Sequence, residues 1–252
     1  MEWYTVCIGI GEIGRPLYEL LKGVCRTLPI DPIYYPENQG KIVDCDFMHV
    51  CIPGELEHFD KIVLDYIHRY EPDIVFIHST VVPGTCRQIQ NQTKVPILNS
   101  PVHGKHQDNQ MKKDMLRYPK YVGMPEGFFE SSVEDVVLKH LTAVGFGDIR
   151  IIEGTENSEW AKILSTTQFG LFVAWAQEVE RICDEFDLDY EYVTDFFPIQ
   201  EDSRGPIYPG FIGGHCVMPN IKLIKEIYSS KLLDWIEWSN SKKENRREQC
   251  YS

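Results

Sequence analysis

The chain has 252 residues, 43% of them hydrophobic, and a formal net charge of −13. This length and apolar content suffice for one large domain or two ordinary domains with a buried core. The negative charge argues against nucleic acid as a partner, because neutralising phosphates requires a concentrated basic face. No apolar run approaches the roughly 20 residues that cross a bilayer, and the N-terminus carries no basic leader. We therefore expect a cytoplasmic protein without a membrane partner.

Eight cysteines are scattered along the chain without a CxxC pair. Several stand inside apolar runs, where cysteine serves as a small hydrophobic residue. Seven of them are interpreted as structural thiols in a reducing compartment, and no metal site is predicted. Cys216 is different, because it stands in an unusual glycine-rich segment that is considered below.

The first part of the chain alternates apolar runs with amphipathic segments. Strands are predicted over residues 4–10, 26–30, 47–52, 73–78, 96–98, 120–123 and 149–152, and helices over 15–22, 55–70 and 131–144. Continuous apolar strands that alternate with helices are typical of a parallel sheet covered on both faces. We expect right-handed crossovers and a doubly wound sheet.

The second part reads as helices. Residues 156–186 contain no proline and predict one long helix of about 45 Å, whose apolar middle requires a second layer of helices or a partner subunit. The next predicted elements are a short helix over 189–197 and a loop over 205–219. They are followed by helices over 221–229 and 232–240 and by a solvated charged end over 242–248. The predicted fold is α/β, with a Rossmann doubly wound parallel sheet (residues 1–154) followed by an all-helical domain with one long central helix (residues 155–252).

A dinucleotide-binding turn follows the first strand. Gly9, Gly11 and Gly14 form G-x-G-x-x-G at the entry of a helix, with Glu12 and Ile13 inside the motif. These glycines permit a tight turn, a close approach to a pyrophosphate and close helix–strand packing, and the helix N-terminus attracts the phosphates.

Asp31 is the candidate acid at the end of the second strand, seventeen residues after Gly14, where it could accept hydrogen bonds from an adenosine ribose. Because no Arg or Lys follows it immediately to bind a 2′-phosphate, NAD is favoured over NADP. The alternative is a flexible glycine turn with a surface aspartate.

Two further strand ends are candidates for contact with the cofactor. Cys51, Ile52 and Pro53 end one strand, and Ser79 and Thr80 end the next. The carboxyl ends of strands form the ligand crevice in such sheets, and Thr80 could bond to the nicotinamide carboxamide or ribose. A simple turn ahead of a helix is the alternative.

Lys162 is the candidate acid–base group on the long helix, where Glu159, Lys162 and Thr166 share one face. A lysine that is desolvated there could polarise or deprotonate a hydroxyl. The alternative is a solvated lysine paired with Glu159.

Cys216 is the candidate nucleophile. It lies in PGFIGGHCVMP, where glycines let the backbone approach a ligand and neighbouring amides could stabilise a thiolate. A nucleophilic thiol could capture an aldehyde as a thiohemiacetal and pass it on as a thioester. The alternative is a buried cysteine in a structural loop.

Taken together, the segments CIGIGEIG, DFMHVCIP, HSTVVPGT, ENSEWAKILSTT and PGFIGGHC resemble the UDP-glucose/GDP-mannose dehydrogenase family, in the family's order and over nearly the whole chain. The resemblance implies a Rossmann domain, a long helix that mediates dimerisation, and NAD-dependent oxidation of a sugar alcohol to a carboxylate in two steps. By position, Cys216 resembles the family's thiol nucleophile, Lys162 its helix lysine and Thr80 its nicotinamide-side threonine.

Three positions depart from the family pattern. Thr166 replaces an Asn, Val102 follows Ser100-Pro101 where an acid is usual, and Asn220 replaces an Asp. In the family those acids are associated with water activation and thioester hydrolysis, so the second oxidation is an open question. The imidazoles of His103, His106 and His215 are candidate substitutes.

The chain ends at Ser252, before the family's third domain, so we expect recognition of a nucleoside diphosphate to be reduced, altered or absent. The leading hypothesis is an NAD-dependent alcohol or sugar dehydrogenase, a homodimer through the long helix, with a small-molecule substrate for which nucleotide sugars are candidates. The alternatives are a 3-hydroxy-acid-type dehydrogenase without thiol chemistry and a non-catalytic NAD-binding protein.

Overall fold

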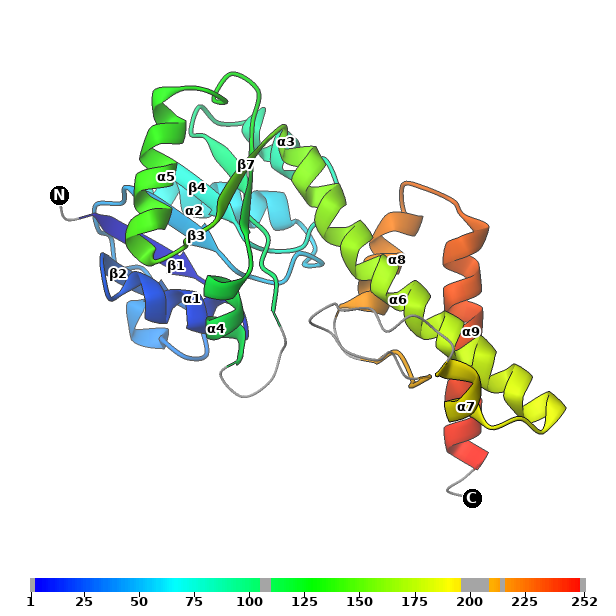
Figure 1. Ribbon diagram of the computed structural model, residues 1–252. Helices are drawn as coiled ribbons and strands as arrows, with labels where there is room; N and C mark the ends of the chain where they lie inside the picture. The colour runs from blue at the N-terminus through cyan, green and yellow to red at the C-terminus, as the bar shows by residue number, and fades with distance from the viewer. Residues whose placement is uncertain (1–2, 105–109, 196–208, 214–215, 250–252) are drawn as a thin grey trace. The chain divides into compact units, whose positions relative to one another are not determined.

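The chain forms two compact units, residues 1–162 and 163–252, and the boundary between them falls inside the long helix. The computed structural model describes residues 3–104, 110–195, 209–213 and 216–249 (Figure 1). The predicted α/β class with a Rossmann-like sheet and one long helix is confirmed.

A seven-stranded sheet forms the centre of the first unit. Its order is β2-β1-β3-β4-β5-β6-β7, and the first five of these strands are parallel. The strands are β1 (Tyr4–Ile8), β2 (Arg26–Ile30), β3 (Phe47–Val50), β4 (Ile74–Ile77), β5 (Ile97–Asn99), β6 (Lys120–Met124) and β7 (Ile149–Glu153). The order reverses between β1 and β3, and the crevice at such a switch point is where ligands bind in open α/β sheets.

The sheet departs from the predicted parallel arrangement at one pair of strands, β5 and β6. Strand β6 pairs with β5 in the antiparallel direction, through Asn99 and Gly123, and β7 is parallel to β6. Antiparallel pairing means that β6 starts at the end of the sheet where β5 finishes. An apolar run predicts a strand but carries no information on its direction.

Helices cover both faces of the sheet (Figure 1). One face packs against α2 (Phe59–Tyr70) and α3 (Thr85–Gln90), and the other against α1 (Gly14–Leu21), α4 (Gln110–Arg117) and α5 (Ser132–Val144). A short 3-10 helix, η1 (Pro36–Asn38), follows β2. Alternate strand residues enter the two cores, as Cys7 and Ile8 of β1 do. The sheet is therefore buried on both faces, as its continuous apolar strands predict.

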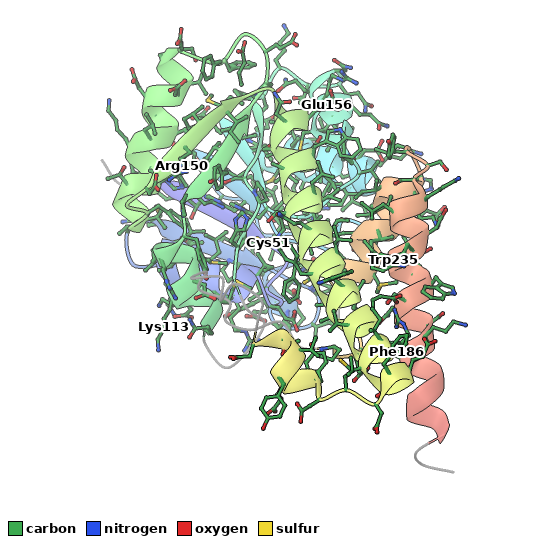
Figure 2. The ribbon with its side chains drawn as sticks, turned by 45° about the vertical axis from the view of Figure 1, so that its right-hand side comes forward. Cys51, Lys113, Arg150, Glu156, Phe186 and Trp235 are labelled. Atoms are coloured by element: carbon green, nitrogen blue, oxygen red, sulfur yellow. The ribbon has the colours of Figure 1, made fainter. Side chains whose placement is uncertain are left out.

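The long helix α6 (Thr155–Phe186) agrees with its prediction to within one residue. Its first turns belong to the sheet unit, where Ser158 donates a hydrogen bond to Asn99 at 2.7 Å and a Cβ on Gly123 would lie 2.1 Å from the Ser158 hydroxyl. The rest of α6 forms the second unit with α7 (Tyr190–Thr194), α8 (Val217–Lys225) and α9 (Lys231–Gln249). Figure 2 labels Glu156 and Phe186 near the two ends of α6.

Two predictions for the second unit are corrected. Helix α8 starts at Val217, four residues before the predicted start, and ends at Lys225. Pro219 suggested a loop but is tolerated in the first turn, where an amide has no helical partner. Helix α9 continues through the predicted solvated end to Gln249, because its Lys, Glu and Arg residues favour helix. Of the predicted helix over 189–197, residues 196–197 lie outside the described part of the chain.

Candidate functional site

The glycine turn joins β1 to α1 with very close backbone contacts. Gly9 has a φ of +83°, which favours glycine, and its amide donates to the Ile30 carbonyl at 2.8 Å. A Cβ on Gly14 would lie 1.7 Å from the Gly9 carbonyl oxygen, so only glycine fits there. Gly11 and Glu12 are exposed in the turn, and Ile13 is the residue before the first turn of α1. The helix N-terminus is thus presented at the sheet's switch point, as phosphate binding requires.

Asp31 is buried directly after β2 and organises the same corner. Its carboxylate accepts hydrogen bonds from the amides of Ile10 at 2.8 Å, Ile33 at 2.9 Å and Tyr34 at 3.0 Å. Burial opposes its charge, but these three amides and the nearby Arg15 together hold the pKa of Asp31 below its ordinary value. The carboxylate is therefore ionised and fixed beside the glycine turn through the Ile10 amide, where a ribose hydroxyl could donate to it.

The ends of β3 and β4 meet beside this turn. A Cβ on Gly9 would lie 2.9 Å from the Ile52 amide nitrogen, and the Ser79 hydroxyl donates to the Ile52 carbonyl at 2.6 Å. Thr80 is half-buried, and its carbonyl packs so closely on Gly54 that a Cβ there would lie 1.9 Å away. Cys51 is half-buried and Pro53 is exposed at the same edge. The structure thus brings the predicted strand-end residues together with the glycine turn.

Lys162 lies on α6 and is half-buried. Its amine donates a hydrogen bond to the Val102 carbonyl at 2.7 Å. Glu159, one turn earlier, accepts hydrogen bonds from the amides of Gly84 at 2.6 Å and Cys86 at 2.9 Å, and so caps the N-terminus of α3. Thr166 follows Lys162 by one turn of the same helix and is half-buried. Lys162 therefore contacts the residue after Ser100-Pro101, the position where the resembled family carries an acid.

Cys216 belongs to the second unit, at the N-terminus of α8. Its carbonyl accepts a hydrogen bond from the amide of Asn220, which is buried one turn later. A Cβ on Gly170 of α6 would lie 2.5 Å from Val217, so α8 packs closely on α6 beside the cysteine. Earlier in the chain, Asn240 bonds to both the amide and the carbonyl of Ile212, at 2.7 and 3.0 Å. Cys216 thus stands at the start of a helix that packs closely on α6.

Of the three histidines considered as substitutes for the missing acids, only His103 lies within the described residues. Its ring packs edge-to-face on Tyr121, with 5.9 Å between the ring centroids. His106 and His215 fall in the parts of the chain that are not described.

The structure also shows a buried polar cluster that the sequence analysis missed. His49 on β3, His78 after β4 and His140 on α5 form a chain of hydrogen bonds, with nitrogen–nitrogen distances of 2.9 Å (His49–His78) and 3.0 Å (His49–His140). Lys120 on β6 lies at its end, 3.3 Å from His78. Single polar residues inside apolar strand runs, such as His49 in Phe47–Val50, are the signal that could have revealed it.

The protonation of this cluster follows from its geometry. His78 Nδ1 lies 2.7 Å from the Ser100 carbonyl, which can only accept, so Nδ1 carries the hydrogen. His49 then donates to His78, and His140 donates to His49. This leaves His140 Nδ1 as a buried acceptor, and it has no hydrogen-bond partner among the described residues. Burial lowers the pKa of His49 and His78 well below the ordinary value and that of His140 to about 3, so all three rings are neutral.

Within the described residues, no group of three or more His, Cys, Asp or Glu side chains is arranged to hold a metal ion. None of the helices in that part of the chain is both long and apolar enough to span a membrane.

Comparison with known proteins supports the sequence resemblance. Residues 156–247 match the profile of the UDP-glucose/GDP-mannose dehydrogenase family, central domain. The resemblance predicted from the sequence is thereby confirmed over this part of the chain. No curated protein matches the chain in sequence.

Solved structures of similar fold include two UDP-sugar dehydrogenases. UDP-D-ManNAc dehydrogenase from Pyrococcus horikoshii is 15% identical with a TM-score of 0.70, over 95% of this chain and 68% of that one. A UDP-glucose dehydrogenase from Pyrobaculum islandicum is 12% identical with a TM-score of 0.71, over 96% and 68%. Mycobacterium tuberculosis 3-hydroxyisobutyrate dehydrogenase is 14% identical with a TM-score of 0.66, over 94% and 91%. At these identities the likeness defines the fold of this chain.

The glycine turn allows a test that separates folding from cofactor binding. A Cβ on Gly11 would meet no atom within 4 Å, so Gly11→Ala should leave the melting temperature unchanged. If a pyrophosphate occupies the turn, the added methyl group stands in its way, and we expect NAD affinity to fall about tenfold or more. Gly147→Ala, equally open and far along the chain, is the matched control. Calorimetric titration with NAD and NADH measures both variants; equal affinities would contradict the assignment.

Proposed function

We propose that the protein is an NAD-dependent oxidoreductase that oxidises an alcohol group of a sugar or a small hydroxy compound. The observation that carries the proposal is the glycine turn with the ionised Asp31 beside it, which fits the pyrophosphate and the ribose of a dinucleotide. Gly9, Gly11 and Gly14 would hold the phosphates, and Cys51, Ile52, Pro53, Ser79 and Thr80 would line the nicotinamide half. When bound, NAD supplies the hydride acceptor.

NAD is proposed rather than NADP because a fixed carboxylate repels a 2′-phosphate. Arg15 lies close enough to this corner to lower the pKa of Asp31, and its guanidinium stacks over the Tyr34 ring, 4.6 Å from the ring centroid. Parallel titrations with NADH and NADPH test the choice. Tighter binding of NADPH would overturn it.

Lys162 is proposed as the group that polarises the substrate hydroxyl and, in its neutral form, takes up the hydroxyl proton. Its amine already donates to the Val102 carbonyl, so it is held on the sheet-side turns of α6 near the strand ends. Thr166, one turn later, could orient the same hydroxyl.

Cys216 is proposed to act if oxidation continues beyond the aldehyde. The thiol would add to the aldehyde carbon to give a thiohemiacetal. Loss of a hydride, for which bound NAD would supply the acceptor, would leave a thioester, and water would release a carboxylate and the thiol. Asn220 is placed one turn after the thiol on α8 but cannot act as a base. The second oxidation therefore depends on another base or is slow.

A 3-hydroxy-acid-type dehydrogenase is the second candidate. The observation that favours it is the similarity in fold to 3-hydroxyisobutyrate dehydrogenase, of which this chain covers 91%, together with Val102 and Asn220 at the two acid positions. Cys216→Ala discriminates, because only a thiol mechanism needs the sulfur. We expect loss of carboxylate formation with retained aldehyde formation if the thiol acts, and unchanged turnover if it does not.

The decisive experiment is a substrate screen. Nucleotide sugars and short hydroxy acids are incubated with the protein and NAD, and NADH formation is followed by absorbance, with calorimetry of NAD and NADH in parallel. Turnover of one class names the substrate. Tight NAD binding without turnover of any alcohol would favour a non-catalytic NAD-binding protein, and no binding of either form would overturn the proposal.

A homodimer through α6 is proposed as the assembly. Four large apolar side chains of α6 are exposed: Leu164 (51%), Trp175 (52%), Ile182 (42%) and Phe186 (66%). Their spacing places them on one face of the helix. Such an apolar stripe is typical of a surface that another protein copy covers. We expect Trp175→Asp to convert a dimer to a monomer in sedimentation experiments, while Tyr192→Asp, an exposed aromatic on α7, has no effect. A monomeric wild type would contradict the proposal.

A further inference from the structure

Lys120 is a buried amine in the sheet unit. It is the first residue of β6 and only 4% exposed. Its Nζ donates to the carbonyls of Ser100 at 2.8 Å and Pro101 at 3.3 Å and lies 3.3 Å from His78 Nδ1, and none of its described hydrogen bonds goes to a carboxylate. Burial is the main cause that lowers the pKa of Lys120 to about 7; Lys162 lowers it further and Cys51 opposes the change.

Stability does not explain this lysine. An apolar side chain of similar length would fill the same space without taking an ammonium group out of water. Polar groups that break the rules of a stable core cluster at functional sites, because there they are retained for another reason. The contacts of Lys120 indicate that reason.

Ser100, Pro101 and Val102 are consecutive residues that follow β5. Two lysines bind their three carbonyls, and the Ser100 carbonyl also accepts a hydrogen bond from His78 at 2.7 Å. Lys120 binds the first two from inside the fold, and Lys162 of α6 binds the third at 2.7 Å. A small pocket with a volume of about 10 Å³, roughly the space of one water, lies beside this segment and is lined in part by Pro101, Val102 and Lys120. One side of the segment is therefore not filled by packed side chains, so its position depends on these hydrogen bonds.

We propose that Lys120 is a positioning residue for alcohol oxidation: its amine fixes the backbone of Ser100 and Pro101 and thereby the Val102 carbonyl that places the Lys162 amine. The inference rests on the proposed function, because it assigns the positioned lysine the role of taking up the hydroxyl proton. It predicts that Lys120 contributes to turnover without touching the substrate or the cofactor. It also predicts that replacing Lys120 by an apolar residue lowers turnover without lowering the stability of the fold.

The test is Lys120→Met in the full chain, with Lys139→Met as the matched control, since Lys139 is an exposed lysine on α5. We expect Lys120→Met to fold with an equal or higher melting temperature, to lower kcat about tenfold or more and to leave the KM values for NAD and for the alcohol within about threefold. Hydrogen exchange of the Val102 and His103 amides should become faster, while exchange elsewhere in the sheet is unchanged. Lys139→Met should change none of these quantities.

The outcomes are separable. A kcat within about twofold of the wild type, with or without faster exchange, overturns the positioning role. If the wild type oxidises no alcohol, the proposed function fails on its own, and unchanged exchange at Val102 and His103 would then also overturn the structural link. Should Lys120→Met fail to fold, Lys120→Gln, which keeps an N–H donor without the charge, is measured in the same way and is expected to retain more activity than Lys120→Ala.

Discussion

Lys162→Met is expected to lower turnover by about 10²- to 10⁴-fold, the usual contribution of a positioned acid–base group. Methionine keeps the length of the side chain but can neither donate to a hydroxyl nor accept its proton. The fold should survive, because the hydrogen bond to the Val102 carbonyl that the substitution removes is worth about 1 kcal/mol. NAD affinity should stay near that of the wild type, since Lys162 is placed on the substrate side. Initial rates of NADH formation and calorimetry measure the two quantities.

Lys61→Met is the matched control, since Lys61 is an exposed lysine on α2. Its turnover should equal that of the wild type. A Lys162→Met protein with undiminished turnover would show that another group takes the proton. A variant that lost NAD binding together with turnover would place Lys162 in the cofactor site instead.

Local patterns in the sequence sufficed for the parts of the site that depend on neighbouring residues. The glycine turn needs only β1, the following helix and Asp31 after β2, and all three lie within the first 31 residues. Likewise, a proline-free segment of the length of α6 with an apolar middle is typical of one long helix. These elements were predictable because periodicity reports local structure directly.

Contacts between distant segments could not be predicted in the same way. The order of the strands and the packing of α5 bring together His49, His78, Lys120 and His140. A single histidine in a sequence does not indicate which residue it will contact. The reversed direction of β6 has the same origin, since pairing direction depends on where the preceding connection returns the chain. Val102 drew notice as a missing acid, whereas its backbone carbonyl makes the contact with Lys162.

Acidification from pH 7.5 to 5.5 is expected to lower the free energy of unfolding by about 4 kcal/mol. His49, His78 and His140 are 0%, 3% and 0% exposed, and burial lowers the pKa of each below the ordinary value of 6.5. The unfolded chain therefore binds three protons in this range that the folded chain does not bind. Each proton contributes about 1.4 kcal/mol at pH 5.5, so stability is lost as the pH falls below 6.5. Lys120 acts in the same direction.

His140→Phe tests the origin of this pH dependence. Phenylalanine preserves the stacking on Phe47, whose ring centroid lies 3.8 Å from that of His140, and removes one of the three protonation sites. Over the same pH interval, the free energy of unfolding of the variant should fall by about 3 kcal/mol rather than 4. This difference holds even if the variant is less stable at every pH because His49 loses its hydrogen-bond partner. His68→Asn, at an exposed position on α2, should leave the slope unchanged. Urea titrations followed by circular dichroism at several pH values measure all three proteins. An unfolding free energy that stays level down to pH 5.5 would mean that the histidine chain is protonated or open in the folded protein.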